Sequence, residues 1–375
     1  MLVDRVRMTN LRSRRSLEVA FGPGLTILVG PNGVGKTTVL EAVALVLQGN
    51  PLRGGSTRDL ISRGEEHLRV ELDLRTQPGQ ATEYGPASER REALITAAAA
   101  YSREGERRLT ADGAPLENST RWREALPVRS FVPDDLRLIK GSPRRRREYL
   151  DTLAGQREPE YESTLKRYEE VLAQRNILLR TSWGRPDSSE FAPWEAILAQ
   201  AGLALCRWRA ATLAAFVPLF QRVHAELTGD PPDTLRLVYR TNASGLDEEE
   251  YRARLAETRE GDRQRTYTHL GPHRDDLRLT RAGIDVRECA SQGEQRAALL
   301  TLVLAEWQYL CGTPQKPLLL LDDVMSELDV DRRSALVALV RTGGQTVITT
   351  TDLRYFTPEE LGTATVVELT PERAG

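Results

Sequence analysis

Apolar positions in the first part of the chain follow the pattern of strands. Residues 25–29 form a short, largely apolar run, as expected for a strand buried on both faces, and residues 3, 6 and 8 mark an earlier strand. Residues 68, 70, 72 and 74 alternate with polar positions, which predicts a strand with one solvated face. A hairpin is expected at 108–116, turning at Asp112-Gly113, and a further strand at 128–132.

The middle of the chain changes to a helical period. Apolar residues recur at helical spacing in 161–179 and again in 197–227, and a linker at 183–186 is predicted to separate the two stretches. This pattern predicts a helical lobe. Its apolar seam fits ordinary helix packing, and a short coiled coil is the alternative.

Strand patterns return in the last third. Leu277 and Leu279 are expected to face Ile284 and Val286 across a turn at 282–283. A strongly apolar helix is predicted at 292–310, and buried strands at 318–321 and 346–349. The whole pattern predicts an α/β protein in three stretches: a sheet formed by residues 1–150 and 266–375, and a helical lobe inserted at 151–265.

A phosphate-binding loop joins the strand at 25–29 to a helix that begins near residue 36. The segment matches G-x-x-x-x-G-K-[ST] in the strand–loop–helix context that this motif requires. Its glycines let backbone N–H groups converge on phosphates, and the helix start adds positive potential. The residues predicted to bind ATP here are Gly30, Pro31, Asn32, Gly33, Val34, Gly35, Lys36, Thr37 and Thr38.

Two carboxylates follow the buried strand at 318–321, in the form of a Walker B motif. Asp322 is placed to hold the water shell of Mg²⁺ together with the hydroxyl of Thr37. Asp323 is placed to orient or polarise an attacking water, and Lys36 to contact the β- and γ-phosphates. We therefore predict Thr37 and Asp322 as metal ligands and Lys36 and Asp323 as catalytic residues.

Almost the whole chain separates the two halves of this site. One nucleotide-binding sheet must therefore be assembled from both chain ends, as in ABC-type and SMC-type ATPase heads. The predicted fold class is accordingly α/β: an ABC-type ATPase head, with a mixed P-loop sheet, helices and an inserted helical lobe.

A third motif opens the apolar helix at 292–310. Ser291, Gln292, Gly293 and Gln295 offer a hydroxyl, a closely approachable backbone and a helix dipole to a γ-phosphate. In ABC-class proteins that phosphate belongs to the ATP of the opposite subunit, and residues 326–329 resemble the D-loop that crosses the same interface. A plain N-cap at Ser291 is the alternative.

Taken together, these segments resemble the RecF family of bacterial recombination mediators. The most specific one is Gly-Pro-His-Arg-Asp-Asp-Leu at 271–277; the others are 9–12, 30–37, 131–136, 140–143, 291–295 and 320–329. The resemblance implies a cytoplasmic DNA-binding ATPase that dimerises with ATP and recognises duplex beside a single-strand gap. It also implies that RecO and RecR act with it to load the RecA recombinase.

Local departures from ABC transporters indicate slow chemistry. Gln292 stands where they have glycine, no switch histidine follows the strand at 346–349, and Asp323 replaces the usual glutamate. A catalytic group misplaced by ~1 Å can cost about 10²-fold in rate. We therefore predict a weak, DNA-dependent ATPase that acts as a timed clamp.

The formal net charge of −2 makes DNA binding through bulk charge impossible, so contacts must come from local clusters. The densest cluster comprises Lys140, Arg144, Arg145, Arg146 and Arg147; a second comprises Arg5, Arg7, Arg12, Arg14 and Arg15. Four consecutive arginines on a helix cannot all face one way. No aromatic residues alternate with them, which favours contact with a duplex backbone; a merely solvated helix start is the alternative.

His273, Arg274 and Asp275 have no single interpretation. A Gly-Pro turn explains the residues before them but not the charged triplet. They are expected to brace the nucleotide site, brace the subunit interface, or form structural salt bridges.

Rival functions are weighed on other features. Three cysteines without CxxC spacing fit a reducing compartment. The apolar runs 299–304 and 318–321 are too short to cross a bilayer, so we do not expect the chain to span a membrane. The subunit of an ABC transporter is the alternative function, but Arg12-Ser13-Arg14 stands where its adenine-stacking aromatic would be sought. The helical stretch is too short for an SMC-type tether.

Overall fold

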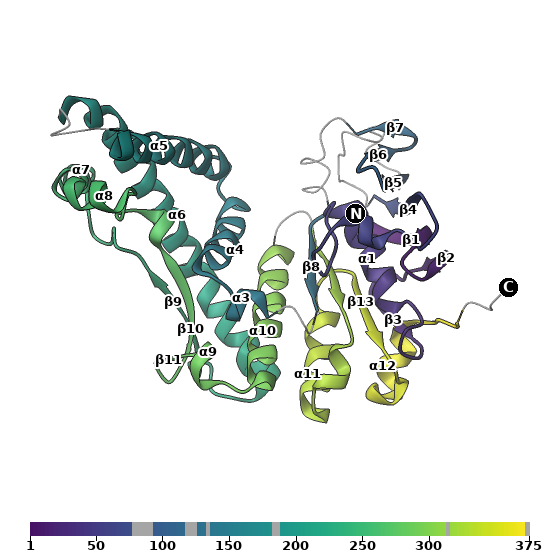
Figure 1. The fold of residues 1–375 in the computed structure, drawn as a ribbon. Helices are drawn as coiled ribbons and strands as arrows, with labels where there is room; N and C mark the ends of the chain where they lie inside the picture. The colour runs from purple at the N-terminus through teal and green to yellow at the C-terminus, as the bar shows by residue number, and fades with distance from the viewer. Residues whose placement is uncertain (77–92, 117–125, 133–135, 182–187, 313–315, 372–375) are drawn as a thin grey trace. The chain divides into compact units, whose positions relative to one another are not determined.

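The computed structural model describes residues 1–76, 93–116, 126–132, 136–181, 188–312 and 316–371 (Figure 1). The chain forms two compact units. The first comprises Met1–Asp135, Glu226–Gly229 and Leu299–Gly375, and the second comprises Leu136–Ala225 and Asp230–Ala298. The second unit is longer at both ends than the predicted lobe of 151–265, and it includes the segment 291–295.

A five-stranded parallel sheet lies at the centre of the first unit. Its strand order is β14-β3-β13-β12-β8, with every neighbouring pair parallel. The strands are β3 (Leu25–Val29), β8 (Val128–Phe131), β12 (Leu318–Leu321), β13 (Thr346–Thr350) and β14 (Thr365–Glu368). Because β3 pairs with β13 and β14, both chain ends build one sheet, and its strands all end at the same edge (Figure 1).

A second sheet of the first unit is antiparallel, with the order β2-β1-β4-β5-β6-β7. Its strands are β1 (Leu2–Leu11), β2 (Arg14–Ala20), β4 (His67–Arg75), β5 (Leu94–Ser102), β6 (Arg107–Ala111) and β7 (Ala114–Pro115). Helix α1 (Lys36–Leu47) shares one hydrophobic core with both sheets, and nearly all of its residues are buried. A helix that is apolar all round requires such a position.

The remaining described elements of the first unit follow the parallel strands. They are η1 (Thr57–Leu60), η3 (Val324–Glu327), α11 (Val330–Arg341), η4 (Leu353–Tyr355) and α12 (Pro358–Thr363). Helix α10 (Gln292–Cys311) begins in the second unit and ends in the first.

The second unit is mainly helical. Its helices are α3 (Arg137–Lys140), α4 (Pro143–Gly155), α5 (Tyr161–Thr181), α6 (Ser188–Thr228), α7 (Glu248–Glu257), α8 (Arg259–Arg265), η2 (Pro272–Arg274) and α9 (Val286–Cys289). A small antiparallel sheet, β11-β10-β9, completes it, with β9 at Leu235–Arg240, β10 at Asp276–Arg281 and β11 at Ile284–Asp285.

Several predicted elements occur where the sequence placed them. The strands at 25–29 and 318–321 have the predicted bounds, and the hairpin turns at Asp112-Gly113, both in left-handed conformation. One prediction is wrong: the strand ends at Asp285 and does not include Val286, because Asp285 also caps a short helix that begins at Val286. The predicted linker at 183–186 and residues 133–135 of the family motif lie outside the described residues.

Helix α6 is a single element although it contains Pro193 and Pro218. By length and composition alone it could cross a membrane, a property that core helices of soluble proteins share. Within the second unit, it contributes buried apolar residues to a core that also contains α5 and α7 residues.

Candidate nucleotide site

The phosphate loop connects β3 to α1 and adopts the conformation that its glycines permit. Gly35 immediately precedes α1 with φ 91°, a left-handed conformation that few other residues adopt without strain. A side chain at Gly30 would collide with the carbonyl oxygen of Leu369, only 2.5 Å from the Cβ position. The loop is therefore shaped both by its own conformation and by the strand next to β3.

Lys36 lies at the start of α1 and is buried. Its Nζ donates hydrogen bonds to the carbonyl oxygens of Gly30 and Pro31, at 2.6 and 3.0 Å. Burial lowers the pKa of Lys36, and the carboxylates of Asp323 and Asp322 oppose that shift. The ammonium group is thus held across the loop, within the electrostatic influence of the two carboxylates.

Thr37 and Asp322 meet although the chain separates them widely. The hydroxyl of Thr37 donates to the carboxylate of Asp322, at 2.8 Å from Oδ1 and 2.9 Å from Oδ2, across 285 positions of sequence. The hydroxyl of Thr349, on β13, donates to Oδ1 of Asp322 at 2.9 Å. This convergence follows from the parallel sheet, which brings the ends of β3, β13 and β12 to one edge.

Asp323 is held in an uncommon conformation beside them. Its φ of 45° is left-handed, and its amide donates to the hydroxyl of Thr349 at 2.9 Å. Its Oδ1 is buried and has no hydrogen-bond partner among the described residues. A strained backbone and an unpartnered buried oxygen together are features of functional sites rather than of plain turns.

The phosphate loop and the carboxylates of Asp322 and Asp323 line one cavity of about 990 Å³. This volume is large enough for a nucleotide. The predicted residues Asn32, Gly33, Gly35, Lys36, Thr37, Thr38, Asp322 and Asp323 all line it. Gly30, Pro31 and Val34 do not line it, although the carbonyls of Gly30 and Pro31 bind Lys36.

The oxygens of Thr37 and Asp322 fit Mg²⁺, which takes a few protein oxygens and completes its shell with water and phosphate. Arg53 also contacts this group: its guanidinium donates to Oδ2 of Asp322 at 2.8 Å. Because this ion pair competes for the same carboxylate, we expect Arg53 to release Asp322 when a metal binds.

Two residues of this site, Arg53 and Thr349, were not predicted from the sequence. Arg53 follows α1 in a stretch without apolar period, and Thr349 is an ordinary β-branched residue of a buried strand. No motif marks either residue. Only the sheet order, which places β13 next to β12, could have indicated Thr349.

The segment 291–295 opens α10 on the surface of the second unit. Ser291 and Glu294 form reciprocal bonds: the Ser291 amide donates to the Glu294 carboxylate at 2.8 Å, and the Glu294 amide to the Ser291 hydroxyl at 3.3 Å. This is a capping box, so the N-cap alternative describes the chain as it stands. Ser291, Gln292 and Gly293 are nonetheless exposed and accessible to a ligand.

Gln295 differs from its neighbours because it is buried, with 4% of its surface exposed. Its Nε2 donates to the carbonyl oxygens of Val286 and Ala290, at 3.3 and 3.0 Å. The side chain thus supports the turn between α9 and α10. We therefore withdraw Gln295 from the predicted phosphate ligands.

The arginines of α4 separate into two sets. Lys140, Arg144 and Arg145 are exposed, and Arg144 forms only a surface pair with Glu148. Arg146 is 3% exposed and forms a two-pronged ion pair with Asp276, at 2.7 and 3.1 Å. It is therefore unavailable to a DNA phosphate, and its predicted role is wrong. Arg147 is half-buried and donates to the carbonyl oxygen of Asp275 at 2.9 Å, so it is less accessible to DNA than the exposed members of the cluster.

The N-terminal arginines are also mostly engaged. Arg5, Arg7 and Arg12 pair with carboxylates of Glu18, Asp73 and Glu41 respectively, at 2.6–2.7 Å. Arg14 is buried, and Arg15 lines the nucleotide cavity. The prediction that these residues form a second basic surface is therefore not supported by their placement.

Two members of the triplet at 273–275, His273 and Asp275, take part in buried polar contacts of the second unit, whereas Arg274 is exposed. Arg209 donates to the carboxylate of Asp275 at 2.8 Å and to that of Asp151 at 2.6 Å, and the hydroxyl of Tyr239 also donates to Asp275. The guanidinium of Arg274 lies 5.5 Å from the ring centre of Tyr267.

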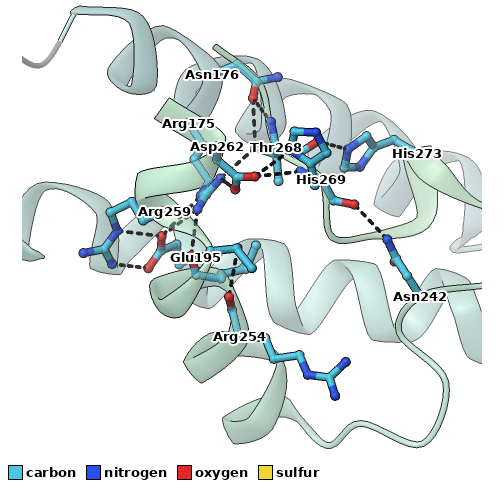
Figure 2. A network of polar contacts seen from close by, with 12 residues as sticks. Arg175, Asn176, Glu195, Asn242, Arg254, Arg259, Asp262, Thr268, His269 and His273 are labelled. Carbon is cyan, nitrogen blue, oxygen red and sulfur yellow. Dashed lines mark hydrogen bonds and ion pairs between the residues drawn. The ribbon is translucent and has the colours of Figure 1, made fainter. Parts of the chain in front are cut away.

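A second polar network of the second unit surrounds Arg175, which is fully buried (Figure 2). It donates to Asp262 and to the hydroxyl of Thr268, both at 2.8 Å, and Asp262 accepts from His269. His273 joins it through Nε2, which donates to the Thr268 carbonyl at 2.9 Å. Of the three roles considered for the triplet, structural bridging is the one that these contacts support.

Acid is expected to destabilise the chain through His273. Its Nδ1 lies 2.7 Å from the hydroxyl of Tyr168, and Nε2 donates to a carbonyl, so the neutral ring satisfies both neighbours. Burial lowers the pKa of His273 from 6.5 to about 4. Between these values the unfolded chain binds a proton that the folded chain does not, so stability falls as pH drops.

The expected loss between pH 7 and pH 5 is about 2 kcal/mol in the free energy of unfolding. Urea unfolding at both pH values measures it, and His273→Gln should lose correspondingly less on acidification. Equal acid sensitivity in the two proteins would show that His273 is not the titrating group.

Comparison with known proteins agrees with this geometry. The family described as RecF/RecN/SMC N terminal domain matches residues 2–367. A protein of Herpetosiphon aurantiacus named DNA replication and repair protein RecF is 36% identical, covering 97% of both chains. One of the same name from Heliobacterium modesticaldum is 34% identical over 98% of this chain and 97% of its own.

Solved structures give the same result. The recombination mediator protein RecF, solved as RecF-ATP in the RecFOR pathway, has a TM-score of 0.74 and 27% identity over 93% of this chain and 92% of that chain. An SMC head bound to the C-winged helix domain of ScpA shares only the fold, with a TM-score of 0.58 and 16% identity. The predicted α/β head fold is confirmed, and a transporter subunit is not favoured. The chain belongs to the RecF family of DNA replication and repair proteins.

Proposed function

We propose that the chain is a cytoplasmic, ATP-gated DNA clamp of recombinational repair. Two copies close around ATP on duplex or gapped DNA, and slow hydrolysis times their release. With RecO and RecR, the clamp helps to load the RecA recombinase. The relatives named RecF, and the RecF structure described as part of the RecFOR pathway, support these partners.

The contact between Thr37 and Asp322 carries the proposal. Their oxygen atoms lie 2.8 Å apart at the mouth of the phosphate loop, and the cavity that they line also contains Lys36 and Asp323. A pair of metal ligands that lies beside a backbone phosphate loop and a buried cation is the arrangement that binds Mg²⁺–ATP in P-loop ATPases.

Each residue then has a definite task. Lys36 exchanges its loop carbonyls for the β- and γ-phosphates, and Thr37 and Asp322 would hold Mg²⁺ with its water shell. The bound metal would neutralise the charge that develops on the phosphates. Asp323, with its unpartnered Oδ1, accepts a hydrogen bond from the attacking water and orients it.

The position of Asp323 also accounts for slow turnover. An aspartate is shorter than the glutamate of transporter subunits, and its left-handed backbone and the bond to Thr349 restrict its movement. Its carboxylate therefore holds the attacking water less closely than a glutamate would, so hydrolysis is slow and ATP acts as a timer.

The exposed start of α10 supports closure by a second copy. Ser291, Gln292 and Gly293 present a hydroxyl and helix amides to solvent, which suit a γ-phosphate held by another protomer. The capping box with Glu294 holds this helix start in place before ATP arrives.

Lys140, Arg144 and Arg145 are the exposed residues of the basic cluster and the ones we expect to contact DNA. Three cations per protomer give about six phosphate contacts in a dimer, so DNA affinity should fall by about 10³-fold between 50 and 200 mM salt. Fluorescence anisotropy of a gapped duplex, with ATP and Mg²⁺, measures this response.

The variant that tests these contacts is Arg144→Gln/Arg145→Gln. It should bind the gapped duplex more weakly, and its DNA affinity should respond less steeply to salt. Turnover on the same DNA should stay below the ~1 s⁻¹ lower limit of typical kinases. A flat salt response of the ATP-bound chain, or fast turnover, would contradict the proposal.

A further inference from the structure

Arg14 is a buried arginine directly behind the phosphate loop. It opens β2 and has only 4% of its surface exposed. Its Nε donates to the carbonyl oxygen of Val34 at 3.0 Å, and Nη2 also contacts that oxygen. Nη2 donates in addition to the carbonyl oxygen of Thr370 at 2.8 Å. Within the described parts of the chain, its hydrogen-bond acceptors are therefore backbone carbonyls.

Arg14 forms no ion pair with the carboxylates that the structure describes. Among the described residues, no carboxylate lies within ion-pairing distance of its guanidinium, whereas Arg7 and Arg12 on the adjacent strand and turn each contact one. Buried charges in proteins are normally paired, because burial without a partner is costly. An anion in the adjacent loop would supply the missing compensation.

The bond to Val34 also fixes the direction of the loop amides. In a planar trans peptide, the carbonyl of Val34 and the N–H of Gly35 point in opposite directions. Because Arg14 holds this carbonyl on its own side, the Gly35 amide is turned away from Arg14. A Cβ at Gly35 would lie 2.9 Å from Nε of Arg14, which shows how closely the guanidinium lies against the loop.

Arg14 links the loop to the C-terminal segment as well. Thr370, its other acceptor, follows Leu369, whose amide donates to the carbonyl of Val29 at 2.8 Å. Arg14 and Thr370 are separated by 356 positions. The Arg14 guanidinium thus connects the antiparallel sheet, the phosphate loop and the segment that follows β14.

We propose that Arg14 is a positioning residue of the phosphate site, which orients the loop amides and adds a buried positive charge beneath the bound phosphates. The inference rests on the proposed ATP binding. Because a charge acts more strongly on a more highly charged ligand, the contribution of Arg14 should increase from AMP to ADP to ATP. A purely structural brace would affect all three nucleotides equally.

The test is the affinity of the full chain for fluorescent N-methylanthraniloyl derivatives of ATP, ADP and AMP. Arg14→Gln should weaken ATP binding by about 10- to 100-fold, the scale of one or two lost charge-assisted bonds, with smaller losses for ADP and AMP. Arg14→Lys keeps the charge but loses the forked donor, so its losses should be smaller and follow the same order.

Arg69→Gln is the matched control, since Arg69 is an exposed arginine of the same unit that pairs with Glu71. It should leave all three affinities unchanged. Equal losses for the three nucleotides in the Arg14 variants, or no loss, would overturn the inference while leaving ATP binding intact. If Arg14→Gln does not fold, the order of losses in Arg14→Lys decides. A wild-type chain that binds none of the nucleotides would instead refute the proposed function.

Discussion

Replacing Lys36 with methionine is expected to weaken ATP binding by roughly 10²- to 10³-fold. Methionine keeps the length of the side chain and removes the one ammonium group that lies across the loop. Losing one partner of a buried charge pair costs ~2–5 kcal/mol, which corresponds to this range. Titration of the full chain with a fluorescent ATP analogue measures the change.

Lys166→Met is the control, because Lys166 is an exposed lysine of α5 in the second unit. It removes the same charge from the chain and should leave ATP affinity unchanged. Thermal unfolding without nucleotide should show that both variants are folded. Wild-type affinity in Lys36→Met would mean that nucleotide does not bind in this cradle.

Replacing Ser291 with arginine is expected to abolish the ATP-dependent dimer while the monomer still binds ATP normally. Ser291 is exposed at the start of α10, so an arginine there is tolerated by the protomer but obstructs an approaching phosphate-bearing surface. The lost N-cap costs only about 0.5–2 kcal/mol locally. Light scattering with and without ATP measures the dimer, and nucleotide titration measures the monomer.

Thr357→Arg provides the matched control. Thr357 caps α12 through the same reciprocal bonds with Glu360 that join Ser291 to Glu294, and it is exposed in the first unit. This variant loses an equivalent cap but should still dimerise on ATP. Normal dimerisation of Ser291→Arg would refute the role of the α10 start at the interface.

The parts of the fold that the sequence predicted well are those in which one local pattern determines the structure. The runs at 25–29 and 318–321 are buried on both faces, so apolar composition alone marks them as central strands. Strand β5 was not predicted, because its run of alanines lacks β-branched residues and gains its strand conformation from pairing with β4 and β6.

In the candidate site, too, the residues marked by a local motif were predicted, whereas side-chain directions that depend on distant partners were not. The loop motif identified Lys36 and Thr37, and the strand-end carboxylates identified Asp322, before any fold was known. Side-chain direction was beyond sequence reasoning: Arg146 and Gln295 turn inward because distant partners, Asp276 and the α9–α10 turn, accept their hydrogen bonds. Contacts between remote segments cannot be inferred from spacing along one of them.

Structure determination of the full chain with ATP and Mg²⁺ tests the shared-site proposal most directly. We expect a dimer in which the Ser291 hydroxyl of each protomer lies within hydrogen-bonding distance of the γ-phosphate held by its partner's loop. If Ser291 lay away from every bound triphosphate, including those of neighbouring protomers, the clamp mechanism would be contradicted.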